Sequence, residues 1–484
     1  MFDRIFWSTG CCAVICAIGL EDKALFDIRG KTVLVVGLAR SGVAAADVLI
    51  KSGATVLAND VKSQAELYEE VQTLSAIGAK LYLDMPPDCL VSQADFIVIS
   101  PGVPIDSPFI AIAQESGKEV ISEIELAYRL CKAPIIAITG TNGKTTTTAL
   151  TGEILRLSGF TTHVVGNIGT PFISKVHEIL AHHKVVAEIS SFQLEATRLF
   201  RPFASAILNI TEDHLNRHKT FENYVAAKAR IFENAQNSDC VVLNADDNVV
   251  SELSSRVNTK VLYFSRKKKL NRGAWIENGT ITVDLGDGRM PICHIDELLI
   301  PGEHNVENAL AAVLLCAIAK APYHDIARAL KCFRGVEHRI ELVDRIRGIA
   351  FYNDSKGTNP DASIKAIKAM KGPTVLIAGG MDKGGSFDEL LNAFGSTVTH
   401  LVVLGETAEK LAKTATATGY ENVLRVKTLE DAVLSAFKLV LPEGNVLLSP
   451  ACASWDMFTD YEHRGRVFKD SVRKLRESNE QKSC

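Results

Sequence analysis

The sequence lacks paired cysteines and any large excess of one charge. None of its 11 cysteines forms a CxxC pair, which argues against a zinc ribbon and against a disulfide framework. The formal net charge of −4 at pH 7 is not the basic balance of a nucleic-acid-binding protein. The basic run SRKKKL at Ser265–Leu270 is expected to be a solvated loop. We therefore expect a cytoplasmic protein with no nucleic-acid partner.

Long apolar runs are also missing. The apolar stretch IFWSTGCCAVICAIGL, from Ile5 to Leu20, is shorter than the roughly 20 residues that a spanning helix needs. One arginine offset by one aspartate precedes it and no A-x-A cleavage site follows, so it is a poor signal peptide. We expect residues 1–28 to be a disordered or dispensable extension. No later segment is predicted to cross a membrane.

What the sequence does contain is three successive segments in which short apolar strands alternate with helices. This alternation predicts an α/β fold with parallel sheets. The chain of 484 residues is longer than one hydrophobic core usually serves, so several domains are expected. We place the seams near Ile121 and Gly335 and predict domains over residues 29–121, 122–335 and 336–484.

The first segment opens with KTVLVVGLARSGVAAADVLIKSGATVLANDV, which predicts a strand, a glycine turn, a helix and a second strand ending near Asp60. Gly37 and Gly42 bracket the turn, but Ala39 stands where a dinucleotide-binding fingerprint requires its middle glycine. From these residues alone, a nucleotide site and a purely structural turn are both open.

The second segment contains a compressed phosphate-binding loop. The predicted strand Ile135–Thr139 leads into GTNGKTTTT, in which only two residues separate Gly140 from Gly143. Backbone N–H groups at a helix start attract anions, and Lys144 adds a positive charge for the β and γ phosphates. The residues predicted to bind ATP here are Gly140, Thr141, Asn142, Gly143, Lys144, Thr145 and Thr146.

Motifs along the chain resemble one enzyme family. In order they are GLARSG, SPGVP, GTNGKTTT, GNIGTP, EISSFQLE, NITEDHLNRH, AAKARIFEN, DSKGTNPDA, GGMDKGG and LSPACASWDMF. From about Lys31 to Lys469 the chain is similar to the ATP-dependent amide ligases that build the bacterial peptidoglycan precursor, which are related to folylpolyglutamate synthase. The resemblance implies an N-terminal Rossmann-like domain for a uridine nucleotide, a central P-loop ATPase-type domain and a C-terminal Rossmann-like domain.

The resemblance also implies the reaction. Within the family the motifs are most similar to those of the member that adds D-glutamate to UDP-N-acetylmuramoyl-L-alanine. ATP would convert the substrate carboxylate to an acyl phosphate, the amine would attack it, and ADP and phosphate would be released. Mg²⁺ is the implied metal, and we expect a monomer without stable membrane insertion.

Four residues are predicted to be catalytic, namely Lys144, Glu188, His214 and Lys228. Glu188 ends an apolar strand, where a carboxylate beside a phosphate loop can bind Mg²⁺. The family places the histidine matching His214 by a second metal. Lys228 would pass for a surface lysine on its helix, but the matching lysine of the family is carbamylated and helps a magnesium site. The predicted metal set is Thr145, Glu188, His214 and carbamylated Lys228.

The remaining predicted site residues come from the same resemblance. Those expected at the UDP-substrate are Ser41, Asp60, Ser100, Pro101, Gly102 and Asn167. Those expected at the adenine, ribose and phosphates, or at the hinge beside them, are Asn305, Asn308, His338, Arg339 and Asp354. Those expected at D-glutamate are Lys356, Thr358, Lys383, Ser454 and Tyr461, the last at a position where the family often has phenylalanine. Lysines and hydroxyls are the groups that two carboxylates require.

Two alternatives remain open. The first is another ligase of the family with a different amine. The alanine-adding member typically has histidine where this loop has Asn142, the diaminopimelate-adding member has a D-N-P-R motif that is missing here, and a folate ligase is expected to lack the first domain. The second is an NAD-binding oxidoreductase or a non-catalytic nucleotide sensor, which predicts no ADP production.

Overall fold

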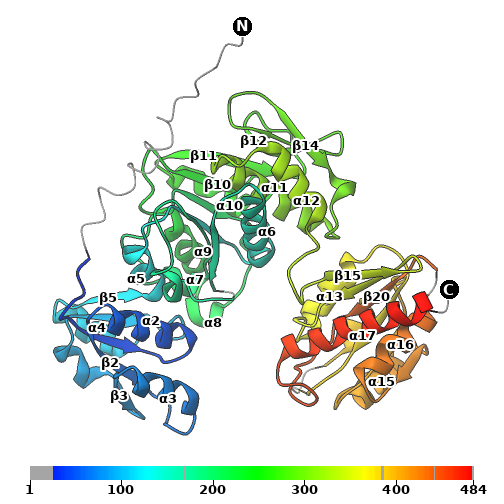
Figure 1. Ribbon diagram of the computed structural model, residues 1–484, viewed down its shortest axis with the longest axis horizontal. Helices are drawn as coiled ribbons and strands as arrows, with labels where there is room; N and C mark the ends of the chain where they lie inside the picture. The colour runs from blue at the N-terminus through cyan, green and yellow to red at the C-terminus, as the bar shows by residue number, and fades with distance from the viewer. Residues whose placement is uncertain (1–25, 168, 383–385, 441, 482–484) are drawn as a thin grey trace. The chain divides into compact units, whose positions relative to one another are not determined.

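The computed structural model describes residues 26–167, 169–382, 386–440 and 442–481 (Figure 1). All but the last three residues of the predicted extension 1–28 lie outside these ranges. The chain separates into two compact units. One comprises residues up to Cys293 with Glu307–Ala329, and the other comprises His294–Val306 with Leu330–Cys484.

The first domain is built on a five-stranded parallel sheet in the order β3-β2-β1-β4-β5. Its strands are β1 (Thr32–Val36), β2 (Thr55–Asp60), β3 (Lys80–Leu83), β4 (Phe96–Ile99) and β5 (Glu119–Ser122). The helices that connect them are α2 (Arg40–Lys51), α3 (Tyr68–Ala76) and α4 (Pro108–Glu115). The predicted strand–turn–helix–strand unit is confirmed. In such sheets ligands bind at the carboxyl ends where the strand order reverses, here between β1 and β4.

The start of the described chain packs on this domain. Ile28 is buried in the core, and the Phe26 ring meets the Phe96 ring edge to face with centroids 5.5 Å apart. The Arg129 guanidinium lies 4.9 Å from the centre of the Phe26 ring. Residues 26–28, which the sequence analysis assigned to the extension, therefore contribute to the fold.

Arg129 links the first domain to the central one through a largely buried network of carboxylates. Glu125 lies on α5 (Glu123–Leu130), and its oxygens accept the backbone N–H groups of Arg198, Leu199 and Phe200. Arg129 donates to the same carboxylate and to Glu119. Because burying a polar group without partners is costly, these bonds offset the cost of placing Glu125 and Arg129 inside the protein.

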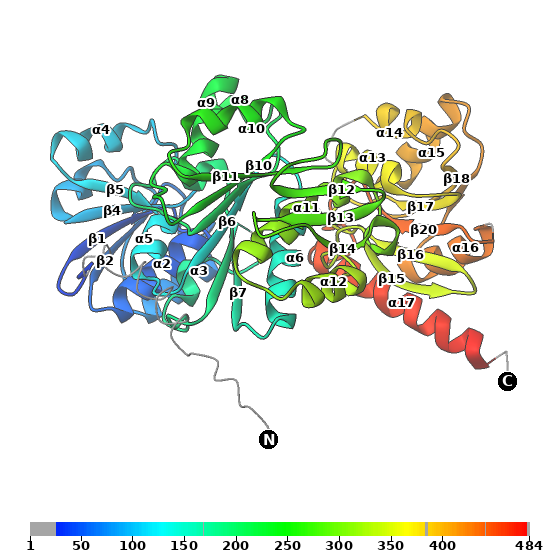
Figure 2. The same cartoon turned by 90° about the horizontal axis from the view of Figure 1, so that it is seen from above.

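The central domain carries a nine-stranded sheet in the order β14-β13-β12-β11-β10-β9-β6-β8-β7 (Figures 1 and 2). Its strands are β6 (Ile135–Thr139), β7 (Thr162–Gly166), β8 (Lys184–Glu188), β9 (Ala204–Ile207), β10 (Cys240–Asn244), β11 (Lys260–Ser265), β12 (Gly273–Glu277), β13 (Thr280–Asp284) and β14 (Met290–His294). Its helices are α6 (Lys144–Leu157), α7 (Ser191–Leu194), α8 (Leu215–His218), α9 (Phe221–Ala229) and α10 (Asn248–Glu252), followed by α11 (Glu303–Ile318) and α12 (Tyr323–Cys332). The predicted strand before the phosphate loop is confirmed residue for residue.

One part of this sheet departs from the parallel pattern that the sequence predicted. β12 and β13 pair antiparallel as a hairpin. The basic run lies between β11 and β12, and Asp246 orders its first residues by accepting the N–H groups of Arg266 and Lys267. It is a loop with exposed lysines, as predicted.

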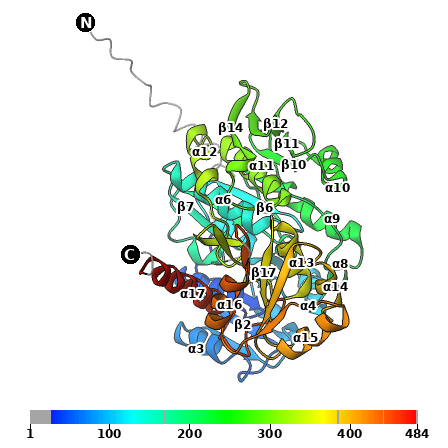
Figure 3. The ribbon, with the colours of Figure 1, turned by 90° about the vertical axis from the view of Figure 1, so that its right-hand side faces the viewer.

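The third domain has six strands in the order β15-β16-β20-β17-β18-β19. They are β15 (Glu341–Ile346), β16 (Ile349–Asn353), β17 (Thr374–Ala378), β18 (Val398–Val403), β19 (Val423–Arg425) and β20 (Asn445–Leu448). The helices are α13 (Pro360–Ala369), α14 (Asp388–Asn392), α15 (Ala408–Ala417), α16 (Leu429–Leu439) and α17 (Tyr461–Gln481), with α17 packed along α16 (Figure 3). The expected all-parallel sheet is wrong at one edge, because β15 pairs antiparallel with β16.

Over the described ranges, none of the helices combines the length and the apolar character that a bilayer span requires.

Candidate active site

The predicted catalytic residues follow three neighbouring strands of the central sheet. β6 lies between β8 and β9, and all three are parallel. The phosphate loop follows β6, Glu188 is the last residue of β8, and His214 lies in the segment after β9. Because carboxyl ends of parallel strands meet at one edge of a sheet, residues distant in sequence are brought to one place.

At Gly143, the second glycine of the compressed loop, both the backbone angle and the lack of space favour glycine. Gly143 has φ +81°, and a Cβ there would lie 2.2 Å from Oδ1 of Asn308. Asn308 is buried on α11, and its Oδ1 also accepts the Thr147 hydroxyl at 3.3 Å. The predicted nucleotide residue Asn308 therefore packs directly on the loop, and Thr147, which was not predicted, holds it there.

Two further residues, which belong to other elements of the domain, fix the loop. Asn209, which follows β9, accepts the Asn142 N–H at 2.8 Å and donates back to the Asn142 carbonyl. The Thr141 hydroxyl lies 3.2 Å from the hydroxyl of Tyr224 on α9. Sequence reasoning missed both residues. A polar residue two positions after the buried strand β9 was the signal that could have identified Asn209.

Lys144 begins α6 and folds back over its own loop. Its Nζ donates to the carbonyls of Gly140 and Thr141, both at 2.8 Å. Thr145 is half-buried in the first turn of the same helix, and Thr146 is buried. The ammonium group thus lies over the helix N-terminus, where the backbone already favours an anion.

Lys228 is the predicted site residue whose surroundings in the structure differ most from those that its sequence suggests. Its exposed fraction is 1%, and its Nζ donates to the Gly140 carbonyl at 2.8 Å, the oxygen that Lys144 also contacts. Burial, together with the nearby charge of Lys144, lowers the pKa of Lys228 to about 6. The surface location that its sequence suggests is wrong, and the amine is largely neutral at pH 7.

Glu188 carries a buried oxygen with no hydrogen-bond partner in the described structure. Its Oε1 accepts the Asn167 side-chain amide at 3.1 Å, whereas Oε2 is sealed and receives no donor. Asn167, predicted at the UDP-substrate, therefore lies against the predicted metal ligand. An unsatisfied buried carboxylate oxygen is costly unless a cation or a donor completes it.

His214 has a strained backbone at the start of α8. Its φ of +53° lies in the left-handed region, which is rare for a residue other than glycine and is typical of functional sites. The ring is half-exposed, packs on Phe192 with centroids 4.9 Å apart, and places Nε2 3.5 Å from Oδ2 of Asp213.

The donor set fits a magnesium ion. Within the described ranges no three His, Cys, Asp or Glu side chains form a ready metal cluster. The orphaned Glu188 oxygen and the neutral Lys228 amine nevertheless supply what an oxygen-ligated site needs: a free carboxylate oxygen, and a nitrogen that can react to become a carbamate.

In the first domain, the predicted UDP-substrate residues gather at the carboxyl ends of β1, β2 and β4. Asp60 closes the glycine turn, since its Oδ2 accepts the Leu38 N–H at 2.7 Å. Ser100 is buried and donates to the Gly37 carbonyl at 2.6 Å. Ser41 lies in the first turn of α2, and Pro101 and Gly102 follow Ser100 in a turn. The turn whose role the sequence left open therefore lies at the reversal of strand order between β1 and β4, the usual ligand position.

In the third domain, two of the predicted nucleotide residues, Asp354 and Arg339, lie near each other. Asp354 follows β16 and accepts the Ser449 hydroxyl at 2.6 Å and the Ile340 N–H at 3.3 Å. Burial raises its pKa to about 7, although Ser449 and the charge of Arg339 oppose the rise. His338 is buried with φ +64°, and Arg339 is exposed.

Asn305, another predicted nucleotide residue, lies on α11 and donates to the Pro301 carbonyl at 2.6 Å.

The predicted D-glutamate residues follow β16 and β20, which are adjacent strands of that sheet. Lys356 has its Nζ 5.8 Å from the centre of the Tyr461 ring. Ser454 is buried in the loop after β20, and Thr358 is half-buried. The Tyr461 hydroxyl, where the family often has phenylalanine, donates to Glu462. Lys383 lies outside the described residues.

Sequence reasoning also missed Arg464, which is buried on α17 and holds two of these loops together. It donates to the backbone carbonyl of Ser355 at 2.8 Å and to that of Cys452 at 3.2 Å. It lies on a helix six residues after Phe458, outside both motifs, so the motifs did not include it.

A prediction about pH follows from Asp354. A carboxyl whose pKa rises from 3.8 unfolded to about 7 folded binds more protons in the folded state between these values. Its contribution to stability is therefore complete below pH 4 and is lost as pH rises through 7. Asp354→Asn should raise the unfolding temperature at pH 8 and leave it nearly unchanged at pH 4, measured by thermal melts without ligands. An equal shift at both pH values would contradict the assignment.

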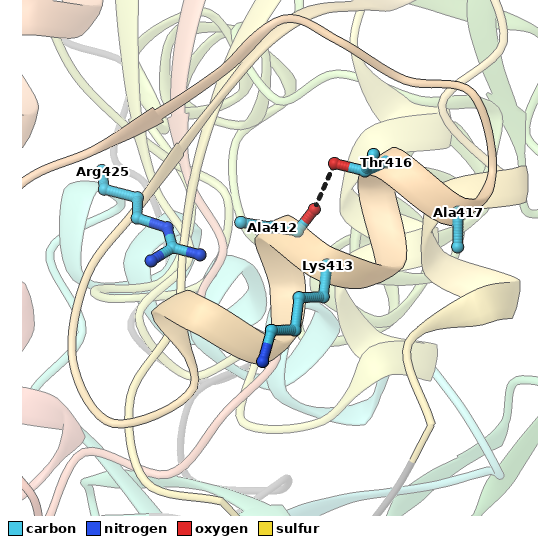
Figure 4. A pocket seen from close by; sticks show the side chains of 5 residues that line it. All are labelled: Ala412, Lys413, Thr416, Ala417 and Arg425. Carbon is cyan, nitrogen blue, oxygen red and sulfur yellow. Dashed lines mark hydrogen bonds between the residues drawn. The ribbon is translucent and has the colours of Figure 1, made fainter.

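A surface pocket of about 370 Å³ also lies against α15, lined by Ala412, Lys413, Thr416, Ala417 and Arg425 (Figure 4). The Thr416 hydroxyl is bonded to the Ala412 carbonyl, and Lys413 is paired with Glu409. None of these residues belongs to a predicted site.

Comparisons with known proteins agree with the three-domain division. Residues 31–122 match "Mur ligase MurD-like, N-terminal domain", residues 138–316 match "Mur ligase middle domain", and residues 338–452 match "Mur ligase, glutamate ligase domain".

Two curated relatives are similar over their whole length. The UDP-N-acetylmuramoylalanine–D-glutamate ligase of Thermoanaerobacter sp. (strain X514) is 49% identical over 452 residues, which cover 93% of this chain and 100% of the relative. The enzyme of the same name from Clostridioides difficile (strain 630) is 47% identical over 453 residues, with the same coverage.

A solved structure shares the fold. The UDP-N-acetylmuramate-alanine ligase of Thermotoga maritima is 20% identical, with a TM-score of 0.54, covering 92% of this chain and 100% of that one.

Proposed function

The chain belongs to the Mur ligase family, within the group of UDP-N-acetylmuramoylalanine–D-glutamate ligases, and on this premise we propose that it joins D-glutamate to UDP-N-acetylmuramoyl-L-alanine at the expense of ATP. One structural observation carries the assignment of the active site. Lys144 and the sealed Lys228 both donate to the Gly140 carbonyl, which places a neutral lysine at a phosphate loop. A protein that only binds a dinucleotide does not require a neutral lysine at its phosphate loop.

The chemistry begins with the substrate carboxylate, which is a poor electrophile. A carboxylate oxygen attacks the γ phosphorus of ATP, the bond to the β,γ-bridging oxygen breaks, and ADP leaves. The amine of D-glutamate then attacks the acyl phosphate, and inorganic phosphate leaves from the tetrahedral intermediate. The protein contributes by neutralising charge and aligning substrates, because these account for most of the catalysis in phosphoryl transfer.

Each predicted catalytic residue receives a role. Lys144 and the loop N–H groups bind the β and γ phosphates of ATP. Thr145, Glu188, His214 and Lys228 are proposed to hold magnesium, which when bound offsets the negative charge of the phosphates. The orphaned Glu188 oxygen supports this role.

Lys228 is proposed to act as its carbamate. An amine must be unprotonated to attack carbon dioxide, and the lowered pKa of Lys228 supplies that form near neutral pH. The nitrogen bonds to the carbon of carbon dioxide and loses a proton to solvent, so that a buried neutral amine becomes an anionic oxygen ligand.

The outer domains are proposed to bind the other substrates. Residues 29–121 would bind the uridine nucleotide through the GLARSG and SPGVP segments. Residues 122–335 would bind ATP, and Asn305, Asn308, Arg339 and Asp354 are also proposed to bind the nucleotide. Residues 336–484 would bind D-glutamate through Lys356, Thr358, Lys383 and Ser454, with Tyr461 lining the site. We further propose a monomer that works in the cytoplasm.

The test is phosphate release from ATP by the purified protein with Mg²⁺ and UDP-N-acetylmuramoyl-L-alanine. D-glutamate, L-glutamate, L-alanine and meso-diaminopimelate are supplied separately as the amine. Turnover with D-glutamate alone is expected. Turnover with another amine would keep the acyl-phosphate chemistry and overturn the roles given to Lys356 and Ser454. No turnover with any amine would contradict the proposed function.

A further inference from the structure

The short helix α8 lies between the predicted catalytic residues of the central domain. His214 caps its start, and the next helix, α9, carries Lys228 (Figure 1). The side chain of Asn223 on α9 donates to the His218 carbonyl at 3.0 Å, so the two helices are bonded to each other. Both residues that flank α8, His214 and Lys219, have positive φ values, of +53° and +70°. A four-residue helix with left-handed residues at both ends needs outside contacts to hold it in place.

Arg217 of α8 provides such a contact with the first domain. One nitrogen of its guanidinium donates to the Val103 carbonyl at 2.8 Å and to Oε2 of Glu195 at 2.6 Å. Its Cζ lies 5.1 Å from the centre of the Phe192 ring, on which His214 also packs. The side chain is 15% exposed, so these bonds are largely shielded from water.

Glu195 extends the connection to the segment that carries Glu188. Its second oxygen lies 3.3 Å from Nδ1 of His218, and Nε2 of His218 lies 3.0 Å from the hydroxyl of Ser191. Ser191 begins α7, three residues after Glu188. Arg217 is therefore linked through Glu195 and His218 to the helix that begins three residues after Glu188, one of the four predicted metal ligands.

The Val103 end of the connection lies in the proposed uridine-nucleotide site. Val103 donates its N–H to the Ser100 carbonyl, and its side chain lies so close to Gly37 that a Cβ on that glycine would be 2.9 Å from it. The SPGVP segment and the GLARSG turn are thus packed as one surface. Moving Val103 relative to α8 would move the bound nucleotide relative to His214.

We propose that Arg217 is a positioning residue that sets the distance between the uridine-nucleotide site and the phosphoryl-transfer site. It does so by holding the SPGVP segment against the helix that His214 caps. This inference rests on the proposed function, because it assumes that the substrate carboxylate must reach the γ phosphate from the first domain. Nothing in the contacts of Arg217 requires it to touch a substrate.

The experiment compares Arg217→Ala and Arg217→Lys with the parent enzyme in the D-glutamate-dependent assay. A misplacement of about 1 Å can cost a reaction about 100-fold, and we expect Arg217→Ala to lower kcat by about 10- to 100-fold. The KM for ATP and the Kd for UDP-N-acetylmuramoyl-L-alanine, measured by calorimetry, should each stay within about 3-fold, since both binding surfaces remain intact. Arg217→Lys keeps one cation and should recover part of kcat.

Arg230→Ala is the matched control. Arg230 also donates to backbone carbonyls, those of Leu194 and Thr197, but within the central domain alone. It should leave kcat within about 3-fold of the parent. A loss of kcat in both arginine variants alike would mean a general packing role and overturn the inference.

The remaining outcomes separate the two claims. An active parent enzyme with unchanged kcat in Arg217→Ala overturns the positioning role and leaves the proposed function standing. A parent enzyme that is inactive with every amine overturns the proposed function, and the positioning role with it. Where Arg217→Ala does not fold, Arg217→Lys decides, and a kcat equal to that of the parent overturns the inference.

Discussion

Lys228→Met is expected to lose about 100- to 1,000-fold of D-glutamate-dependent turnover and yet to unfold at a higher temperature than the parent protein at pH 7. The loss of activity follows from removing a group held at the phosphate loop, where single contributors to charge stabilisation are typically worth this much. The gain in stability follows from removing a buried amine whose protonated form the fold disfavours.

The pH dependence of the gain has a definite sign. The pKa of Lys228 is 10.5 in the reference state and falls to about 6 in the fold because of burial and then Lys144. Between these values the unfolded chain binds a proton that the folded chain does not, so the parent protein becomes more stable as pH rises from 6 toward 10.5. The advantage of the methionine variant should shrink over the same range, which thermal melts at pH 6.5, 8 and 9.5 in buffer depleted of carbon dioxide would show.

Two comparisons make this prediction specific. Lys175→Met removes a lysine from an exposed ion pair with Glu178 and should change neither activity nor the pH dependence of unfolding. Adding bicarbonate to the parent protein should weaken that pH dependence, because a carbamate nitrogen no longer titrates as an amine. A methionine variant that unfolds at a lower temperature at every pH would contradict the burial argument.

The parts of the fold that could be predicted are those that depend on neighbours in the chain. The strand Ile135–Thr139 is a continuous apolar run that ends in a glycine loop, and the structure has the same strand. The β1-α2-β2 unit follows from the same kind of pattern. Both rest on periodicity and on the backbone freedom of glycine, which act locally.

The parts that could not be predicted depend on register between distant segments. Gly143 is restricted by Asn308, and Arg217 meets Val103 across 114 positions of sequence. The burial of Lys228 is a second feature that the local sequence could not predict. Its helix has low amphipathicity, and nothing local decides whether the lysine faces water or the Gly140 carbonyl. Packing of α9 on the loop decides it, and packing overrides local pattern.

Lys144→Met is expected to reduce kcat/KM for ATP by about 1,000-fold, which corresponds to about 4 kcal/mol of transition-state stabilisation. The ammonium group lies over the N-terminus of α6, within 2.8 Å of two loop carbonyls, and it is the side-chain cation that the loop itself supplies. Methionine keeps most of the apolar stem of lysine and removes the ammonium group with its charge and its two hydrogen bonds, and the fold of α6 should persist.

Lys144→Met should impair the binding and reaction of ATP and leave the binding of UDP-N-acetylmuramoyl-L-alanine unchanged. The first domain has its own contacts, with Ser100 bonded to Gly37 and Asp60 to Leu38, and neither depends on the phosphate loop. Calorimetric binding of UDP-N-acetylmuramoyl-L-alanine to Lys144→Met should therefore match the parent protein. Lys184→Met, on the same sheet but packed against the rings of Phe160 and Phe203, is the control for removing a lysine and should keep its turnover. If Lys144→Met retains more than a tenth of the parent kcat/KM, the loop holds the phosphates by its backbone N–H groups and the helix dipole, and the lysine has another role.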